Sequence, residues 1–261
     1  MANYVERHSL IGKRALVTGA SRGLGAQIAT LFAEAGADVA LVARDEEGLH
    51  QTKATVEAGG RQALVIAADL GTTEGPREAA STALEHFGAI DILVNNAGIV
   101  HLESLREATI DHWDETMAIN LRAPFLLARE LAPRMIEQGS GKIVSISSVA
   151  GVRGLPNHGA YCASKGGLQM LNAVMVAEWS RHNIQANVIA PTVVMTDMGK
   201  QVWSDPAKSG PMLDRIPMGR FGEPVEIADL ALFLASPASD FVCGQVIEID
   251  GGITQTLGNA T

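Results

Sequence analysis

The stretch Thr18-Gly-Ala-Ser-Arg-Gly-Leu-Gly25 joins an apolar run, Arg14-Ala-Leu-Val17, to a segment of helical period, Leu24 to Ala35. Glycines allow a tight turn there and let backbone N–H groups approach a pyrophosphate at the N-terminus of the helix. The spacing is G-x-x-x-G-x-G and departs from the common G-x-G-x-x-G, and glycines alone serve many tight turns. The position of this turn, between the first strand and the first helix, still predicts a dinucleotide site.

The end of the second predicted strand, Asp38 to Val42, bears on the type of dinucleotide. An acidic side chain at that end would bond the adenosine ribose 2′-hydroxyl, but Ala43 and Arg44 stand there. A guanidinium suits a 2′-phosphate, and Arg22 in the glycine turn adds a second positive charge. Alternatively, both arginines are solvated surface residues and Asp45 partly neutralises Arg44. We favour NADPH over NADH.

Short β-branched runs alternate with longer segments of helical period. Strands are predicted at residues 14–17, 38–42, 62–67, 90–94, 142–146, 185–189 and 245–249, and helices at 24–35, 45–58, 73–87, 111–137, 159–181 and 224–234. Strands that are apolar on both faces and separated by helices predict a parallel sheet covered on both sides. The fold class is therefore α/β, a Rossmann-like doubly wound seven-stranded parallel sheet with helices on both faces. Without a linker or repeat, residues 1–261 are expected to form a single domain.

Composition excludes several classes of protein. Apolar residues make up 47% of the 261 residues, and the net charge is −9 with no long basic run, so nucleic acid and anionic membranes are not expected partners. The N-terminus has no apolar h-region and no run is long enough to span a bilayer. The two cysteines, Cys162 and Cys243, cannot form a disulfide framework, and a cytoplasmic location is expected.

Residues 192–222 interrupt the alternation of strands and helices. Glycines and prolines are frequent in this stretch, and Trp203 and Met212 lie among them. A long irregular segment in an α/β domain is typical of a binding loop or lid, although a plain surface excursion has the same composition. We expect a substrate loop here.

Tyr161-Cys-Ala-Ser-Lys165 lies near the start of a predicted long helix. Positions four apart share a helix face, so the phenol and the ammonium are expected side by side, where the positive charge would lower the pKa of the phenol. Ser148 comes thirteen residues earlier, at the carboxyl end of a strand, where ligands bind in open parallel sheets. Ser147, directly before it, is its rival.

The chain resembles the short-chain dehydrogenase/reductase family over nearly its whole length. The resemblance rests on five motifs taken together: Thr18–Gly25, Asn95–Gly98, Ser148, Tyr161–Lys165 and the Pro191 loop. It implies that Tyr161 exchanges a proton with the substrate oxygen while C4 of the nicotinamide exchanges a hydride. It implies that Ser148, favoured over Ser147 by its spacing of thirteen residues to Tyr161, bonds the same oxygen. It also implies that Lys165 lowers the pKa of Tyr161 and binds the nicotinamide ribose. Asn120 is expected to kink its helix and to hold a water that links Lys165 to solvent.

The resemblance also implies a cofactor-binding set. Asp69 would bond the adenine amine, Asn96 would line the cofactor cleft, and Thr196 would contact the carboxamide or the diphosphate. The full expected set is Gly19, Ser21, Arg22, Gly23, Leu24, Gly25, Arg44, Asp69, Leu70, Asn96, Ala97, Gly98, Tyr161, Lys165, Pro191, Val194 and Thr196. No His, Cys and Asp cluster has the spacing of a metal site, so no metal is expected.

The substrate loop departs from the family pattern, because Thr192 follows Pro191 where the family commonly has glycine. The stretches 191–199, 203–206 and 215–219 resemble those of the L-xylulose reductases. This resemblance suggests that the substrate is a small polar ketone, a ketose or a diketone, which is reduced to an alcohol. His158 and Asn157 either face the substrate or cap the helix, and His101 either touches the substrate or lies on the surface.

Two other functions share these motifs. One is a 3-oxoacyl-thioester reductase, which needs a basic patch for an acidic carrier; Arg129, Arg134 and Arg153 keep that possibility open. The other is a cofactor-binding regulatory protein without turnover, which would not need the Ser–Tyr–Lys set. The resemblance further implies a homotetramer, in which helices 111–137 and 159–181 pair with a second subunit and residues 245–250 complete the assembly.

Overall fold

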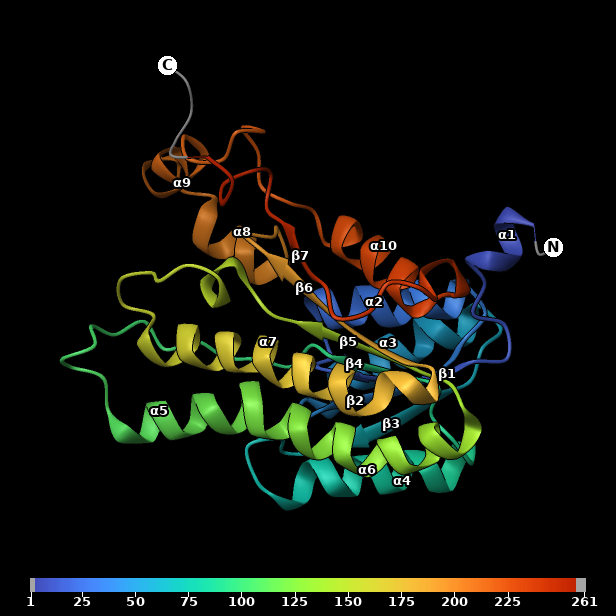
Figure 1. The fold of residues 1–261 in the computed structure, drawn as a ribbon. Helices are drawn as coiled ribbons and strands as arrows, with labels where there is room; N and C mark the ends of the chain where they lie inside the picture. Colours follow the sequence, from blue (N-terminus) through green and yellow to red (C-terminus); the bar gives the residue numbers. More distant parts are fainter. Residues whose placement is uncertain (1–2, 257–261) are drawn as a thin grey trace.

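A sheet of seven parallel strands forms the centre of the computed structural model, which describes residues 3–256 (Figure 1). The strands lie in the order β3-β2-β1-β4-β5-β6-β7 and every neighbouring pair is parallel. Their bounds are β1 Arg14–Thr18, β2 Asp38–Ala43, β3 Ala63–Ala67, β4 Ile92–Asn95, β5 Gly141–Ile146, β6 Ile184–Pro191 and β7 Val246–Ile249. The chain reverses its direction of travel across the sheet between β1 and β4, and such a switch point is where ligands bind in these folds. The predicted fold class is confirmed.

Helices cover both faces of the sheet. One face packs against α2 (Gly23–Glu34), α3 (Glu46–Ala58) and α10 (Pro224–Ala235), through a core that includes Phe32 and Leu49. The other face packs against α4 (Glu74–Phe87), α6 (Ala123–Gln138) and α7 (Gly159–Trp179), through a core that includes Leu131 and Met135. The chain starts with α1 (Tyr4–Arg7), and short 3₁₀ turns occur at η2 (Val149–Gly151), η3 (Ser180–His182) and η4 (Pro237–Ser239).

The predicted helix 111–137 is interrupted. It consists of α5 (Ile110–Met117), a π-helical turn η1 (Ala118–Arg122) and α6. Asn120 lies within the widened turn, and its side chain bonds both the N–H and the carbonyl of Ile99 at 2.9 Å. The prediction of one continuous helix was therefore wrong, and the irregularity expected at Asn120 takes the form of a π-helical turn, a feature frequent at functional sites.

The segment 192–222 is more regular than predicted. It contains α8 (Asp197–Trp203) and α9 (Pro206–Leu213), whose first turns are capped by the side chains of Thr196 and Asp205. Val194 and Gly222 pair across the base of the segment, and the rings of Trp203 and Phe221 lie 5.5 Å apart. Both helices lie beyond the carboxyl ends of β6 and β7 (Figure 1, upper left). The segment is thus a helical flap beside the strand ends, not an irregular loop.

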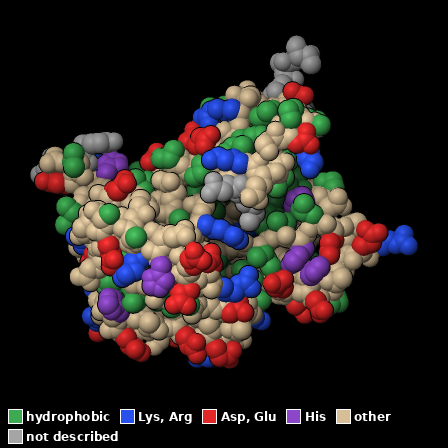
Figure 2. All heavy atoms as spheres, turned by 180° about the vertical axis from the view of Figure 1, so that it is seen from behind, with side chains coloured by type: hydrophobic (Ala, Val, Ile, Leu, Met, Phe, Trp, Pro, Cys, Tyr) green, Lys and Arg blue, Asp and Glu red, His purple; other side chains and the backbone are tan. Residues whose placement is uncertain are grey.

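Charged side chains are mixed over the surface. Figure 2 shows acidic side chains over much of the lower half of one face, with Lys and Arg side chains between them. Between residues 3 and 256, no helix is long and apolar enough to cross a membrane.

Candidate active site

Three of the four residues of the expected catalytic set meet at the carboxyl ends of β4 and β5. Ser148 follows β5 in extended conformation, and Tyr161 and Lys165 lie in the first turns of α7. The side chains of Ser148 and Tyr161 lie close enough to interact, and this polar contact lowers the pKa of the phenol. Burial has the larger effect and raises the pKa of Tyr161 above its ordinary value. Lys165 was expected to lower the pKa of the Tyr161 phenol, but the net shift of that pKa in this structure is upward.

Lys165 is almost completely buried, with 3% of its surface exposed. Its Nζ donates to the carbonyl oxygen of Ile146 at 2.8 Å and lies 5.7 Å from the centre of the Tyr161 ring. Burial lowers the pKa of Lys165 to about 8. The ammonium is thus held by the end of β5, close to the phenol but not directly bonded to it.

Asn120 connects the catalytic helix to the loop after β4. Its amide bonds the main chain of Ile99 on one side and donates to Ser164 Oγ at 3.1 Å on the other. Ser164 in turn donates to the carbonyl of Tyr161 at 2.8 Å. Asn120 is fully buried, and Gly98 lies against both Asn120 and Lys165, at 3.3–3.4 Å from where a Cβ would be. These contacts bring all four expected catalytic residues into one connected group.

The structure separates Ser148 from its rival Ser147. Ser147 is buried, and its hydroxyl donates to the carbonyl of Lys165 and accepts from Gln169, both at 3.1 Å. Ser148 is half-buried and in polar contact with Tyr161. Ser147 therefore holds α7, whereas Ser148 remains the candidate for contact with a substrate.

The glycine turn forms a close-fitting cradle. Gly19 has φ +67° and a Cβ there would lie 2.8 Å from Asn96 Nδ2, while one at Gly25 would lie 2.2 Å from the carbonyl of Gly19. Asn96 Nδ2 donates to the Thr18 carbonyl at 2.8 Å, so Asn96 braces the turn rather than only lining a cleft. Backbone that approaches this closely at the start of α2 fits a pyrophosphate.

Two exposed arginines flank this cradle. The guanidinium groups of Arg22 and Arg44 have no ion-pair or hydrogen-bond partner among the described residues. Asp45 instead caps α3, accepting from the N–H of Gly48 at 3.1 Å. Two unpaired guanidinium groups at the end of β2 and in the glycine turn fit the 2′-phosphate of NADP.

The other expected cofactor residues differ in their surroundings. Thr196 caps α8 and its Cβ and Cγ2 lie 3.7 Å from a Cβ position on Gly23, so the flap meets the glycine turn. Asp69 is exposed and accepts from the N–H of Gly71 at 2.9 Å. The remaining residues have these positions: Ser21 beside the start of α3, Ala97 bonded to Thr18, Pro191 at the end of β6, Val194 and Leu24 against the core, and Leu70 after β3. The side chain of Leu70 is buried in the core, so it is not available to a ligand.

Sequence reasoning missed one group of contacts beside Tyr161. Glu103 donates its N–H to the Asn157 carbonyl at 3.0 Å, and its carboxylate bonds His112. His101 stacks on His112, with ring centres 3.9 Å apart. No periodic pattern in the sequence marks this group, because its members are linked by a loop backbone and by ring stacking.

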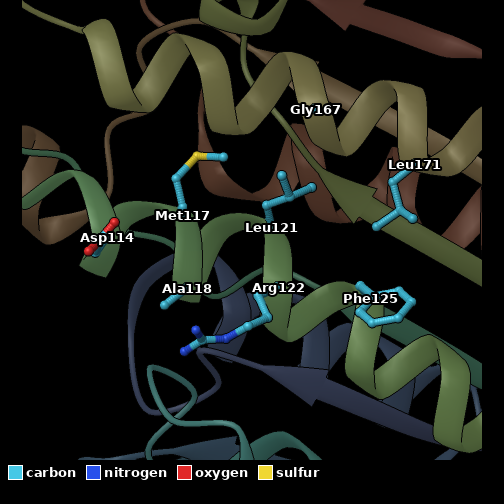
Figure 3. A pocket seen from close by; sticks show the side chains of 8 residues that line it. All are labelled: Asp114, Met117, Ala118, Leu121, Arg122, Phe125, Gly167 and Leu171. Atoms are coloured by element: carbon cyan, nitrogen blue, oxygen red, sulfur yellow. The ribbon is translucent and has the colours of Figure 1, made fainter.

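A groove of about 700 Å³ lies elsewhere, between the π-helical turn and α7. Figure 3 shows the side chains of Met117, Leu121 and Leu171 directed into the space between these helices. Neither Tyr161 nor Ser148 lines this groove, so it is separate from the candidate active site. Within residues 3–256, no group of three or more metal-ligating side chains comes together.

Comparisons with known proteins agree with this geometry. Residues 19–254 match the family model described as enoyl-(acyl carrier protein) reductase. The chain is 41% identical to D-threitol dehydrogenase of Mycolicibacterium smegmatis over 94% of each protein, and 41% identical to L-xylulose reductase of Bos taurus over 95% of this chain and 98% of that protein. A gluconate 5-dehydrogenase from Burkholderia cenocepacia, solved in complex with NADP and tartrate, superposes with a TM-score of 0.92 at 38% identity, covering 98% of this chain and 100% of that one.

Proposed function

Because this chain belongs to the short-chain dehydrogenase/reductase family of enzymes acting on CH–OH groups, we propose that it interconverts a small polar ketone and its secondary alcohol with NADP(H). The family resemblance predicted from the five motifs is confirmed. The observation that carries the proposal is the position of the buried Lys165, whose Nζ is held by the Ile146 carbonyl at the end of β5 and lies 5.7 Å from the centre of the Tyr161 ring, beside Ser148.

The proposed substrate is a polyol or sugar and the corresponding ketose. Three relatives with 38–41% identity support it, since their names specify threitol, xylulose and gluconate. Each of these compounds carries several hydroxyl groups, which is consistent with a substrate segment whose sequence resembles that of L-xylulose reductases. The flap formed by α8 and α9 is the part of the chain that we propose closes over the substrate.

The reaction needs a hydride carrier, and NADP supplies or takes the hydride at C4 of its nicotinamide ring when it is bound. Ser148 and Tyr161 hold the substrate oxygen between them. The phenol of Tyr161 gives a proton to the ketone oxygen in reduction and takes one from the alcohol in oxidation. Since burial raises the pKa of Tyr161, the phenol stays protonated at neutral pH, which suits reduction. The Lys165 ammonium favours the phenolate when oxidation is required.

The preference for NADP over NAD rests on Arg22 and Arg44. Both are exposed and unpaired within the described residues, and Ala43 offers no carboxylate to the ribose 2′-hydroxyl. Asp45, which would weaken a 2′-phosphate site by its negative charge, is directed to the start of α3 by its bond to Gly48.

The acyl-thioester alternative is less well supported. Its acidic carrier would need free basic groups, but Arg129 pairs with Glu130 at 2.8 Å, Arg134 pairs with Glu137, and Arg153 donates to the Thr254 carbonyl at 3.2 Å. A regulatory protein without turnover would have no need of the joined Ser148, Tyr161 and Lys165.

We further propose that the protein forms a homotetramer and is located in the cytoplasm. Large apolar side chains are exposed on α6 and α7 and around β7, where a second copy would cover them: Phe125, Met170, Val174, Phe241 and Val246. Cys162 and Cys243 are both free thiols, in keeping with a reducing compartment.

The test is a substrate panel followed at the nicotinamide absorbance. Threitol, xylitol, gluconate and glycerol would be offered with NADP and with NAD, and xylulose and acetoacetyl thioesters with the reduced cofactors. The proposal expects turnover of a polyol or ketose with NADP(H) as the better cofactor. Activity on acyl thioesters alone would overturn it.

A further inference from the structure

The loop between β4 and α5 is tied to the start of the catalytic helix. Glu103, in the middle of this loop, donates its backbone N–H to the Asn157 carbonyl at 3.0 Å and pairs with His158 in a short parallel bridge. Leu105 lies so near α7 that a Cβ on Gly159 would be 2.8 Å from its Cδ1. The segment that these contacts hold is followed at once by Tyr161. In Figure 1 the two loops lie together at the left end of the molecule.

The carboxylate of Glu103 fixes the loop to α5. Its Oε1 accepts from His112 Nδ1 at 2.6 Å, and because a carboxylate accepts only, the imidazole nitrogen must carry the proton. His112 lies in the first turn of α5, where its N–H is capped by Thr109 Oγ1. Glu103 therefore joins two helices, through its side chain to α5 and through its backbone to the residues that precede α7.

A second histidine supports this bond. The rings of His101 and His112 are stacked, with centres 3.9 Å apart and planes inclined by 2°. His101 Nε2 bonds Glu115 Oε2, one turn along α5, at 2.9 Å. Two carboxylates and two stacked rings thus form one unit, the His–Glu quartet: Glu103, His112, His101 and Glu115. The stacking supports the plane of the His112 ring in which Nδ1 meets Glu103 Oε1.

The segment held by the quartet is conformationally demanding. Asn157 has φ +62°, in the left-handed region, although it carries a side chain. Such a conformation is uncommon for a residue with a side chain and persists where surrounding contacts support it. The bond from the Glu103 N–H to the Asn157 carbonyl is one such contact. His158, the next residue, bonds the Pro156 carbonyl through Nδ1 at 2.7 Å, and its ring centre lies 6.2 Å from that of Tyr161.

We propose that Glu103 is a positioning residue for Tyr161, acting as part of the His–Glu quartet. It holds residues 156–158 in place and thereby sets the direction in which the catalytic helix begins. The proposal rests on the proposed function, since it assigns Tyr161 the proton transfer. A displacement of about 1 Å at a reacting group can cost about 100-fold in rate, so a loosened helix start lowers kcat. The glycine turn lies on the far side of β4, so the affinity for the cofactor is expected to remain unchanged.

The experiment compares substitutions that break or keep the Glu103–His112 bond. Glu103→Ala and His112→Leu break it, and we expect each to lower kcat by about 10-fold or more while the Kd for NADPH changes less than about two-fold. Glu103→Gln keeps an acceptor, and His112→Asn keeps a donor at the position of Nδ1; both are expected to retain kcat within about three-fold. Glu107→Ala, in the same loop but bonded only to Ser104, is the control and should resemble the unaltered enzyme.

The double variant Glu103→Ala/His112→Leu tests whether the two residues act as a unit. Its kcat is expected to equal that of either single variant, whereas two losses that multiply would overturn the proposal. Equal loss of kcat in Glu103→Gln and Glu103→Ala would also overturn it, as would a parallel loss of NADPH affinity.

A second readout needs no substrate. Amide hydrogen exchange of residues 155–160 is expected to rise in Glu103→Ala and in His112→Leu, and to stay unchanged in Glu107→Ala and His112→Asn. If the unaltered protein oxidises no polyol, the proposed function fails, while the exchange measurement still decides whether the quartet holds this segment. If the protein is active and exchange is the same in all variants, the quartet proposal fails alone.

Discussion

Lys165 Nζ donates a hydrogen bond to the carbonyl oxygen of Ile146 at 2.8 Å, so the end of β5 holds the buried ammonium of α7. Burial lowers the pKa of Lys165 to about 8 from its ordinary value of 10.5. The charge beside Tyr161 therefore depends on pH in the slightly alkaline range. The stability of the folded protein and the charge beside Tyr161 therefore both depend on the protonation of Lys165.

Replacing Lys165 by Met tests that link. Below pH 8 the folded protein keeps a buried ammonium, which costs up to about 3 kcal/mol of stability for a shift of this size. Between about pH 8 and 10.5 the unfolded chain binds a proton that the folded chain lacks, so the stability of the unaltered protein rises with pH. Lys165→Met has no such group. Urea unfolding of both proteins without cofactor at pH 7 and 9.5 should show the unaltered protein gaining on the variant at the higher pH.

A difference in unfolding free energy that is the same at both pH values would contradict this prediction. The comparison of two proteins at each pH removes the contributions of all other titrating groups, since these are common to both. The loss of the bond to Ile146 lowers the stability of the variant by a constant amount and does not affect the trend.

Ser148→Ala is expected to lower kcat/KM by about 100-fold, because the substrate oxygen loses one of its two bonding partners. The Kd for NADPH, measured by fluorescence titration, should be unchanged. Ser147→Ala is the matched control. It removes the bonds to the Lys165 carbonyl and Gln169, and is therefore expected to lower Tm by a few degrees while kcat/KM changes less than about five-fold. The reverse pattern would assign the catalytic role to Ser147.

Tyr161→Phe is expected to reduce turnover to the limit of detection, since it removes the proton donor and acceptor and leaves the helix intact. The Kd for NADPH should stay within a few-fold of its original value. Tyr161 is half-buried and its hydroxyl is in polar contact with Ser148, so the variant also removes this contact. Activity near that of the unaltered enzyme would remove Tyr161 from the mechanism.

Arg44→Leu is expected to raise KM for NADPH by about 10-fold or more and to leave KM for NADH unchanged, because one charge-assisted contact to a 2′-phosphate is lost. The ratio of kcat/KM for the two cofactors is the measurement. Arg7→Leu removes the same charge from α1, at the opposite end of the molecule in Figure 1, and should leave that ratio as it was. Comparable kcat/KM for NADH and NADPH in the unaltered enzyme would contradict the assignment.

The sequence was sufficient to predict the sheet and most of the active site for physical reasons. Strands buried on both faces are continuous apolar runs, and glycines are required where Gly19 and Gly25 approach neighbouring backbone, so both leave clear patterns. Tyr161 and Lys165 lie on one helix, where spacing determines which side chains share a face. Ser148 was separable from Ser147 only by its spacing to Tyr161, and the structure shows Ser147 bonded elsewhere.

Other features left no readable pattern. The π-helical turn at Asn120 adds one residue to a helix whose apolar period continues on both sides, so the sequence predicts one helix. In the flap, Pro206 and Pro211 indicate a break, yet Pro206 is at the first turn of α9, where proline is tolerated. The His–Glu quartet joins a loop to two helices, and contacts between different elements follow from tertiary packing alone.

Exposed apolar side chains on α6 and α7 lead to the last prediction. Phe125 is 42% exposed and Met170 is 67% exposed, and Phe125 also lines the groove of Figure 3. If a second copy covers these helices, charges placed there are desolvated on association and weaken it. Phe125→Asp/Met170→Glu is expected to reduce the mass measured by light scattering from that of a tetramer to that of a dimer or a single chain. Val5→Asp, on the 73% exposed Val5 of α1, should leave the mass unchanged. An unaltered protein that scatters as a single chain would contradict the tetramer itself.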